Sequence, residues 1–365
     1  MKRPSRRFVP RLTQSPLRPV PPERAPMVFR TDAPPTAAAR DYPLETMRAV
    51  AVFLLVAYHA IGSGPMSGLE LDYPHPLRLF ADFLIDLRMP FFAFIAGYVY
   101  GLRPIALGDY GSFITGKFRR LYIPGAIAAT LMMIMAGLFE SGSARTWADF
   151  WQVYFFPYAH YWFLQAILLI FVFFGALDMA LRGRFTTVLL VLSVVPYLFA
   201  GFIPSNVMSI NAAIYLLPFF LLGVVFIRHL PRIAQAAPWL IGLSVLVVIV
   251  ATATNLSLLR ASGELSLQRY DVQSLAMGLA VCMLAMLTLP RVARFEALGP
   301  YAFTIYLYHV FGTAGARDAL QAFGITAVTP IFLTSIVCGI ALPVVLHRLS
   351  ERWGLTRRYI LGKKR

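Results

Sequence analysis

Apolar stretches long enough to cross a membrane recur along most of this chain, from Ala49 to Val345. A helix needs about 20 predominantly apolar residues to span the hydrocarbon core of a bilayer. Charged residues and clusters of Pro and Gly divide the pattern into separate segments. We therefore expect an all-α polytopic membrane protein whose helices surround a central polar cavity. The ten predicted spans are residues 44–63, 78–102, 121–139, 161–178, 185–203, 212–227, 237–254, 272–289, 300–316 and 330–347.

Composition supports this class. Hydrophobic residues make up 58% of the 365 residues and charged residues only 14%, whereas about a quarter of a soluble domain is charged. We expect a disordered, basic, Pro-rich tail at residues 1–43, one transmembrane domain at 44–347 and a basic tail at 348–365. Cys282 and Cys338 both lie in apolar stretches, so they indicate neither a disulfide framework nor a metal site.

The distribution of positive charge predicts orientation. Most of the 33 Lys and Arg residues fall in the two tails and in the loops of one side. Cytoplasmic loops carry this excess, so both termini should be cytoplasmic. The net charge of +16 then follows from topology, and we expect no nucleic-acid partner.

The first predicted span contains two polar side chains whose burial in a membrane costs free energy. Arg48 and His59 are eleven positions apart, which at about 100° per residue places both on one helix face, about 16 Å apart along the axis. A cation and an imidazole inside a membrane helix are by default functional candidates. Taken singly, Arg48 could instead snorkel to the headgroups and His59 could form an ordinary hydrogen bond between helices.

The second span holds a further intramembrane cation. Arg88 lies near its middle, out of reach of either interface, so it should face a polar cavity or a carboxylate. Asp82 and Asp86 lie on its outer side. A local Asp–Arg pair that only stabilises the helix is the alternative interpretation.

A basic cluster precedes the third span. Lys117, Arg119 and Arg120 would stand beside a helix N-terminus, where cations and the helix dipole together suit a polyphosphate. For any single cluster of this kind, an ordinary positive-inside anchor is the simpler explanation.

Aromatic and histidine side chains mark two later spans. Tyr306 and His309 are three residues apart and share a helix face, where aromatic packing is the alternative role. His160, Tyr161 and Trp162 begin the fourth span, where an aromatic belt is expected in any case. The sequence contains no signature of nucleotide hydrolases, serine hydrolases or zincins.

Taken together, these motifs resemble the acyltransferase 3 family of integral membrane acyltransferases over about residues 40 to 350. The resemblance rests on five motifs in register: Arg48 with His59, Arg88 to Phe92 with Ala96-Gly97-Tyr98, Lys117 with Arg120 and Pro124, Trp162-Phe163-Leu164, and Tyr306-Leu307-Tyr308-His309. Two serines common in the family are replaced here by Ala96 and Ala302, so no role of those hydroxyls carries over. No fused extracytoplasmic hydrolase-like domain is expected.

The resemblance implies transfer of an acyl group, with acetyl as the default, from acetyl-CoA or another cytoplasmic acyl-CoA to a hydroxyl of an extracytoplasmic glycan or lipid-linked sugar. It implies a multi-pass protein of the cell inner membrane that works in the lipid bilayer, with acyl-handling or polysaccharide-export proteins as candidate partners and without a metal. In this scheme Lys117, Arg119 and Arg120 hold the coenzyme A phosphates. His59 is the general base, Arg48 or Arg88 keeps it neutral, and Arg88 stabilises the oxyanion. Trp162, Tyr306, His309 and Asp86 are further candidates for the cavity.

Two other functions stay open at this point. A transporter or flippase of glycans, lipids or small acids also fits ten spans with intramembrane cations. The first five spans show no similarity to the last five, which weighs against an internally repeated transporter. A scaffold in a polysaccharide-export complex would leave Arg48, His59 and Arg88 without a reason to lie in the membrane.

Overall fold

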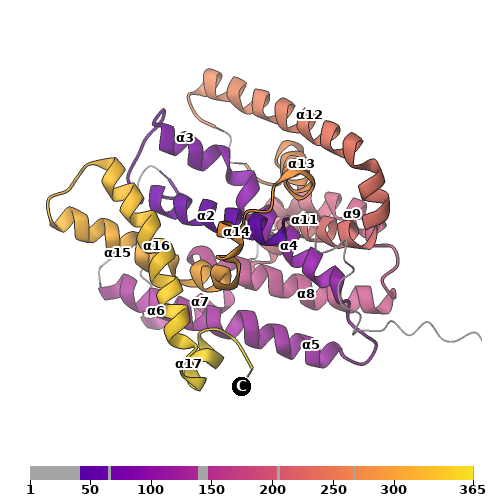
Figure 1. The fold of residues 1–365 in the computed structure, drawn as a ribbon, viewed down its shortest axis with the longest axis horizontal. Coiled ribbons are helices and arrows are strands. Elements are labelled where there is room, and N and C mark those ends of the chain that lie inside the picture. The colour runs from indigo at the N-terminus through magenta and orange to yellow at the C-terminus, as the bar shows by residue number, and fades with distance from the viewer. Residues whose placement is uncertain (1–41, 65–66, 139–146, 204–205, 266–267, 365) are drawn as a thin grey trace, which may run out of the picture.

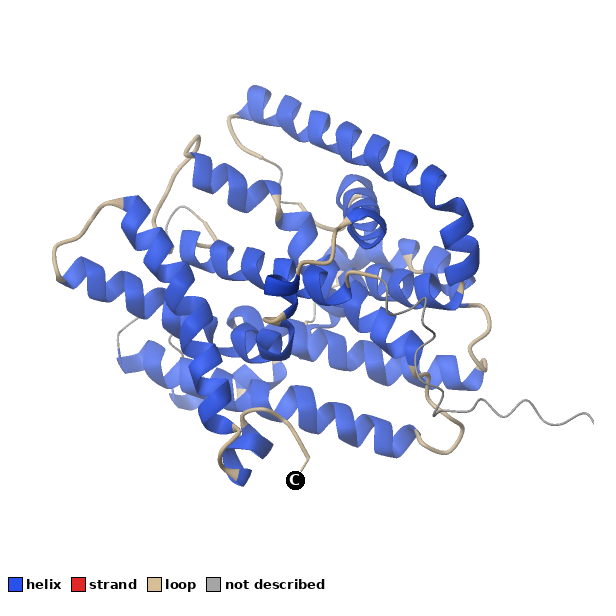
Figure 2. Cartoon of the chain, viewed as in Figure 1, coloured by secondary structure: helices blue, strands red, loops and turns tan. Residues whose placement is uncertain are grey.

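The computed structural model describes residues 42–64, 67–138, 147–203, 206–265 and 268–364. Within these ranges every regular element is a helix and none is a strand (Figure 2), which confirms the predicted all-α class. The predicted tail at 1–43 lies outside the described residues except for its last two positions.

The helices follow one another along the chain with short connections (Figure 1). Their bounds are α2 Leu44–Ile61, α3 Pro76–Phe83, α4 Ile85–Leu102, α5 Tyr110–Lys117, the π-helical η1 Phe118–Tyr122, α6 Ile123–Leu138, η2 Trp147–Asp149, α7 Gln152–Phe155, η3 Ala159–Tyr161, α8 Trp162–Ala180, α9 Thr186–Leu192, α10 Val194–Phe199, η4 Ala200–Phe202, η5 Val207–Ser209, α11 Ile210–Arg228, α12 Leu230–Ser262, α13 Val272–Thr288, α14 Ala293–Glu296, η6 Gly299–Tyr301, α15 Ala302–Ala322, α16 Val328–Ser350 and α17 Gly354–Tyr359.

Several of these helices are apolar and long enough to cross a membrane, so the chain is a multi-pass membrane protein. By length and composition, six helical stretches of the described chain qualify, or seven if the bent pair Val272–Thr288 and Ala293–Ala322 counts as one span. All ten predicted segments fall on helix, but the number of membrane crossings stays a prediction. The second predicted segment is not one continuous helix, because the chain breaks at Leu84 between α3 and α4.

Two glycines set the closest helix contact at the centre of the molecule. Helices α4 and α11 form the most extensive helix pair. A Cβ added at Gly97 would lie 1.9 Å from the carbonyl oxygen of Phe220, and one at Gly223 would lie 2.1 Å from that of Phe94. Small residues let membrane helices approach until their backbones touch, which gains dispersion contacts that lipid cannot replace. This pair holds α4 in place beside α2 and α13.

Helix α12 lies at the edge of the molecule (Figure 1), and most of its side chains are exposed. Apolar residues such as Leu246, Ile249 and Val250 are more than half exposed. An exposed apolar face of this length suits contact with lipid rather than water. The candidate site instead lies among α2, α4, α5, α8 and α15, on the other side of the α4–α11 pair.

Candidate functional site

A cavity of about 260 Å³ lies among α2, α4, α8, α15 and the junction of α5 with η1. Three cations line it, and the rest of its wall is apolar or aromatic, whereas a polar cavity was expected. The apolar wall suits an acyl chain or a pantetheine arm rather than a hydrated ion. Its lining residues are Arg48, Phe92, Ile95, Ala96, Val99, Lys117, Arg120, Leu121, Phe163, Leu164, Ile167, Phe171, Ala302, Phe303 and Tyr306.

Arg48 occupies the cationic end of this cavity. Its guanidinium Nη1 lies 2.6 Å from Glu45 Oε1, one helical turn earlier, and its side chain is a quarter exposed. Arg48 lines the cavity while it is paired with this carboxylate. The shared face predicted for Arg48 and His59 therefore runs from the cavity at one end of α2 to a histidine cluster at the other.

The basic cluster does not stand at a helix N-terminus, and that prediction was wrong. Helix α5 continues through η1 into α6, so the backbone N–H groups at Lys117, Arg119 and Arg120 lie inside one helical stretch and offer no helix-end dipole. Lys117 Nζ lies 3.7 Å from the ring centroid of Phe171 and 5.1 Å from that of Phe113. Lys117 and Arg120 line the cavity, whereas Arg119 is not among its lining residues.

A layer of three aromatic rings closes the far end of the cavity. The ring centroids of Phe92, Phe163 and Tyr306 lie 5.6 to 6.0 Å apart. Phe163 and Phe171 both line the cavity and are eight residues apart on α8, so the cavity extends about 12 Å along that helix. Tyr306 also donates a hydrogen bond to the carbonyl oxygen of His160, which ties the layer to the next part of the site.

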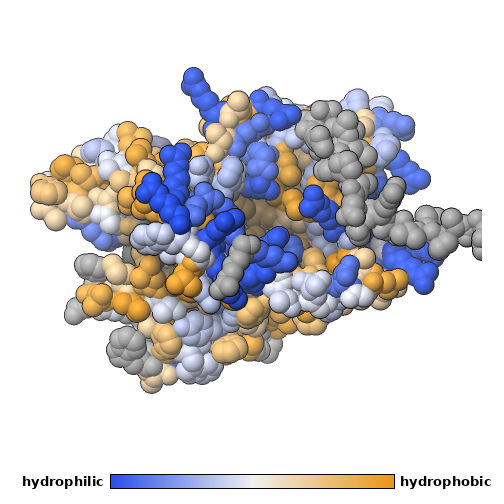
Figure 3. Space-filling model, turned by 60° about the horizontal axis from the view of Figure 1, so that its bottom comes forward, coloured by the Kyte–Doolittle hydropathy of each residue, from blue (hydrophilic) through white to orange (hydrophobic). Residues whose placement is uncertain are grey.

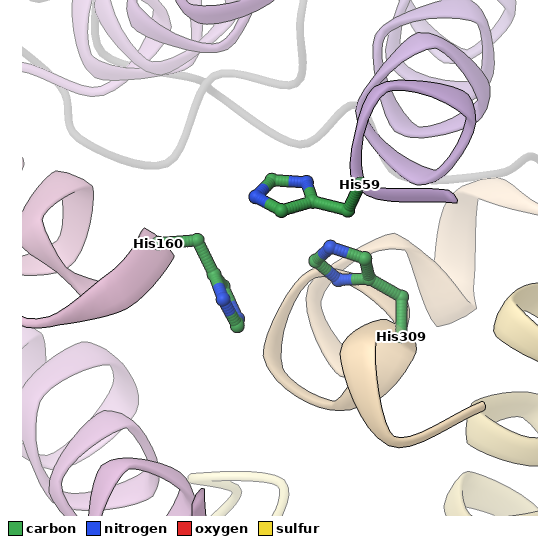
Figure 4. A group of neighbouring side chains, drawn as sticks. All are labelled: His59, His160 and His309. Atoms are coloured by element: carbon green, nitrogen blue, oxygen red, sulfur yellow. The ribbon is translucent and has the colours of Figure 1, made fainter. Parts of the chain in front are cut away.

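Three histidines meet behind this aromatic layer. His59 comes from the end of α2, His160 from η3 and His309 from α15, and their rings point toward one another (Figure 4). The ring centroids lie 4.8 Å apart for His59 and His309, 4.7 Å for His160 and His309, and 5.5 Å for His59 and His160. Spans that are far apart in sequence thus bring three titratable groups together.

Backbone carbonyls fix which nitrogen of each neutral imidazole carries the proton. His59 Nδ1 donates to Leu55 O at 2.9 Å, and His309 Nδ1 donates to the carbonyls of Ile305 and Tyr306 at 3.0 Å each. His160 Nε2 donates to Leu307 O at 3.4 Å. When a ring is neutral, its other nitrogen is unprotonated and can act as an acceptor or base. Among the described residues, the remaining nitrogens of His160 and His309 are buried and have no partner.

The same geometry gives the cluster a limited capacity for metal. One ring nitrogen from each histidine lies within 4.8 Å of one from each of the others, so the three could ligate a transition metal. Tetrahedral zinc with Zn–N bonds of about 2.0 to 2.1 Å needs nitrogens about 3.4 Å apart, so the rings would have to close in. The sequence predicted no metal, and that stays a prediction.

Arg88 has an environment that neither sequence interpretation anticipated. Its guanidinium carbon lies 3.6 Å from the ring centroid of Tyr58, which precedes His59, and Nη1 donates to Ala81 O at 3.0 Å. In the described part of the chain no carboxylate pairs with it. Its charge is held beside the histidine cluster by a cation–π contact and one hydrogen bond, which leaves other N–H donors of the guanidinium free.

Both acidic residues of the second segment have other partners. Asp82 forms an ion pair with Arg78 and accepts a hydrogen bond from the Tyr73 hydroxyl at 2.6 Å. Burial, together with this hydrogen bond, raises the pKa of Tyr73. Asp86 is buried and accepts a 2.6 Å hydrogen bond from Ser274 on α13, so it does not line the cavity. A local Asp82–Arg88 pair is therefore absent, and Arg78 has the structural role instead.

Trp162 also lies away from the cavity wall. Its neighbours Phe163 and Leu164 line the cavity, whereas the ring centroid of Trp162 lies 6.0 Å from the guanidinium carbon of Arg269. By contrast, Ala96 and Ala302 both line the cavity. These are the two positions where alanine replaces a serine common in the resembled family, so the substitutions remove hydroxyls from the cavity wall itself.

Sequence reasoning missed one member of the cluster. His160 was assigned only to an aromatic belt, yet it lies between His59 and Tyr306. The available signal was a histidine next to Trp162-Phe163-Leu164 at the start of an apolar helix. No single-helix periodicity could have joined it to His59, because the two are on different spans.

Comparison with known proteins identifies the family of this chain. The sequence model of the acyltransferase domain of the acyltransferase 3 family matches residues 41–348, which is most of the chain. That match contains every residue of the cavity wall and of the histidine cluster. Comparison with curated proteins and with solved structures gave no match. This chain therefore belongs to the acyltransferase 3 family and is a multi-pass membrane acyltransferase.

Proposed function

We propose that this protein transfers an acyl group, acetyl by default, from a cytoplasmic acyl-CoA to a hydroxyl of an extracytoplasmic glycan or lipid-linked sugar. The observation that carries this proposal is a cavity with cations and an otherwise apolar wall, separated from the histidine cluster by one layer of aromatic rings. A phosphate-bearing donor with a long neutral arm fits cations followed by an apolar channel. Family membership favours this function over the transporter that the sequence left open.

The donor enters the site from the cationic end. Lys117, Arg120 and Arg48 hold the phosphates, and the acyl-pantetheine arm lies along Ile167 and Phe171. The thioester then has to pass between Phe92, Phe163 and Tyr306 to meet His59. Movement of these aromatic side chains is therefore part of the reaction cycle. While the layer is closed, it keeps the thioester away from water on the far side until an acceptor is present.

His59 acts as the general base. Its Nδ1–H is committed to Leu55 O, so Nε2 receives the proton of the acceptor hydroxyl as that oxygen attacks the thioester carbonyl. The C–S bond then breaks and the same proton passes from Nε2 to the leaving thiolate, which gives free coenzyme A and an ester. General-base catalysis of this kind contributes about 10²- to 10⁴-fold to rate.

Three further side chains act around this step. The unpartnered nitrogens of His160 and His309 accept hydrogen bonds from hydroxyls of the acceptor. Arg88 donates to the oxyanion that forms on the thioester carbonyl, because its fixed charge lies beside Tyr58 in a site that excludes water. The cost of keeping Arg88 without a carboxylate partner inside the protein is consistent with such a task.

Acyl transfer by the purified protein in proteoliposomes tests the proposal. Wild-type protein should transfer radiolabelled acetyl from acetyl-CoA to a glycan acceptor, and His59→Ala should lose at least about 100-fold of this rate. The matched control is His229→Ala, since His229 lies outside the cluster and contacts Thr187. Mass spectrometry of surface glycans and glycolipids from a deletion strain should identify the acceptor by a missing acyl mass. Full activity of His59→Ala, with insertion and yield equal to wild type, would overturn the role of His59.

A further inference from the structure

The C-terminal segment packs against the basic cluster at the cavity. After α16 the chain turns through α17 and folds back, so that Leu361 is buried and Ile360 packs against the core. At Gly362 the φ angle is +64°, and an added Cβ would lie 2.8 Å from Arg120 Cα and 3.1 Å from Arg119 O. The backbone of this segment therefore lies directly on η1, and residues 360–363 are packed against the protein.

This contact creates a second hollow, of about 510 Å³, in front of the cavity. Arg120, Leu121 and Phe303 line both spaces, so the hollow lies directly beside the cavity. Figure 3 shows hydrophilic residues gathered on the middle of this face, with hydrophobic residues to either side. The residues that line the hollow are Arg120, Leu121, Phe303, Arg357, Leu361, Gly362, Lys363 and Lys364.

Among the described residues, four cations and no carboxylate line this hollow. Lys363 forms an ion pair with Glu351, and that contact lowers the pKa of Glu351. In the described part of the chain, Arg120, Arg357 and Lys364 have no carboxylate within 4.0 Å. Like charges held together by packed backbone repel one another, so an anion between them lowers the electrostatic energy. Arg357 and Arg120 can also bind phosphate through two N–H groups at once.

We infer that the C-terminal segment forms one wall of a binding site for the nucleotide phosphates of the acyl-CoA donor, with Arg357 and Lys364 facing Arg120 across it. This inference rests on the proposed function. The 3′-phosphate of coenzyme A lies in the hollow, and the diphosphate lies beside Arg120, which lines both spaces, with Lys117 and Arg48 on its cavity side. The pantetheine arm enters the cavity past Phe303. The family match ends at residue 348, so Arg357 and Lys364 belong to a segment outside the matched domain.

Donors with and without the nucleotide test this inference. The variant is Arg357→Ala with Lys364→Ala, and the substrates are acetyl-CoA and S-acetyl-pantetheine, which has no phosphates. We expect the KM for acetyl-CoA to rise about tenfold or more, the KM for S-acetyl-pantetheine to stay unchanged, and kcat to stay within about twofold. Lys117→Ala with Arg120→Ala should likewise raise the KM for acetyl-CoA and leave the KM for S-acetyl-pantetheine unchanged. Arg352→Ala is the matched control, because it removes an exposed charge from the same segment outside the hollow.

Arg357→Lys with Lys364→Arg keeps the charges and should restore most of the affinity for acetyl-CoA. A direct reading is the binding of adenosine 3′,5′-bisphosphate to the purified protein by calorimetry, which the Ala variant should weaken and the Arg352 control should not. This measurement needs no turnover, so it separates failure of this inference from failure of the proposed function.

Three outcomes would overturn the inference. The KM values for both donors could rise together, which would indicate a structural role for the segment. Both KM values could stay unchanged, which would leave the cations without a role in donor binding. The variant could instead lose affinity only for vesicles that contain phosphatidylglycerol, which would assign these cations to lipid headgroups.

Discussion

The Tyr306 hydroxyl donates a hydrogen bond to the backbone carbonyl oxygen of His160. Tyr306 lines the cavity, whereas His160 belongs to the histidine cluster, so this bond joins the two halves of the site. It also fixes η3 against α15, although 146 residues separate the two partners.

Removal of this hydroxyl should slow turnover without weakening donor binding. A hydrogen bond of this kind contributes about 0.5 to 1.5 kcal/mol, so Tyr306→Phe should lower kcat about 2- to 13-fold. The KM for acyl-CoA should stay near the wild-type value, because the phosphate-binding cations are unaffected. Steady-state kinetics separate the two parameters. Tyr308→Phe is the control, since Tyr308 is outside the cavity wall, and an increase in KM alone would contradict the predicted role.

The turnover rate should fall even when Arg88 is replaced by another cation. Lysine has no planar guanidinium to stack on Tyr58 while donating to Ala81 O. We expect Arg88→Lys to lower kcat by about 10²-fold, in the range found when one oxyanion donor is lost, with little change in KM. Kinetics of acetyl transfer provide the measurement, with exposed Arg260→Lys as the control. Normal turnover of Arg88→Lys would leave Arg88 with a structural role only.

Chelation of metal should leave the reaction intact. The histidine nitrogens are up to 4.8 Å apart, which exceeds the spacing of about 3.4 Å for tetrahedral zinc, and the Arg88 cation lies over the residue next to His59. We therefore expect EDTA to change the rate less than twofold and elemental analysis to find much less than one zinc per chain. One tightly bound zinc per chain, absent from His160→Ala, would show that the rings close around a metal.

The approach of α4 and α11 should be intolerant of a single methyl group. At Gly97 the added Cβ of Gly97→Ala meets the backbone oxygen of Phe220, which cannot move without shifting a helix. Overpacking of this kind costs about 1 to 3 kcal/mol. We expect a clearly lower thermal unfolding midpoint in detergent, followed by tryptophan fluorescence.

The control for this change is Gly137→Ala. Gly137 lies in α6, and a Cβ added there meets no atom within 4 Å. Its midpoint should be unchanged or slightly higher, because alanine favours helix over glycine by about 1 kcal/mol. Equal midpoints for Gly97→Ala and wild type would show that the two helices can separate at little cost.

Local pattern determined much of this protein. The apolar runs predicted helix at all ten segments because a helix satisfies its own backbone hydrogen bonds inside a bilayer. The period of 3.6 residues placed Arg48 and His59 on one face of α2, and the charges singled out Lys117 and Arg120 at the cavity. These features depend on residues that are close together in sequence.

Tertiary structure alone decided which groups meet. His160 joins His59 and His309 because three helices distant in sequence pack together, and no periodicity within one helix encodes that contact. Arg88 contacts the ring of Tyr58 rather than Asp82, because the Asp82 carboxylate is paired with Arg78. The basic cluster does not lie at a helix end, because η1 continues into α6. The cations of the C-terminal segment lie beside it, because Gly362 permits backbone contact with Arg120. Sequence thus identified most of the charged and histidine side chains of the site, and the packing of distant helices determined their partners.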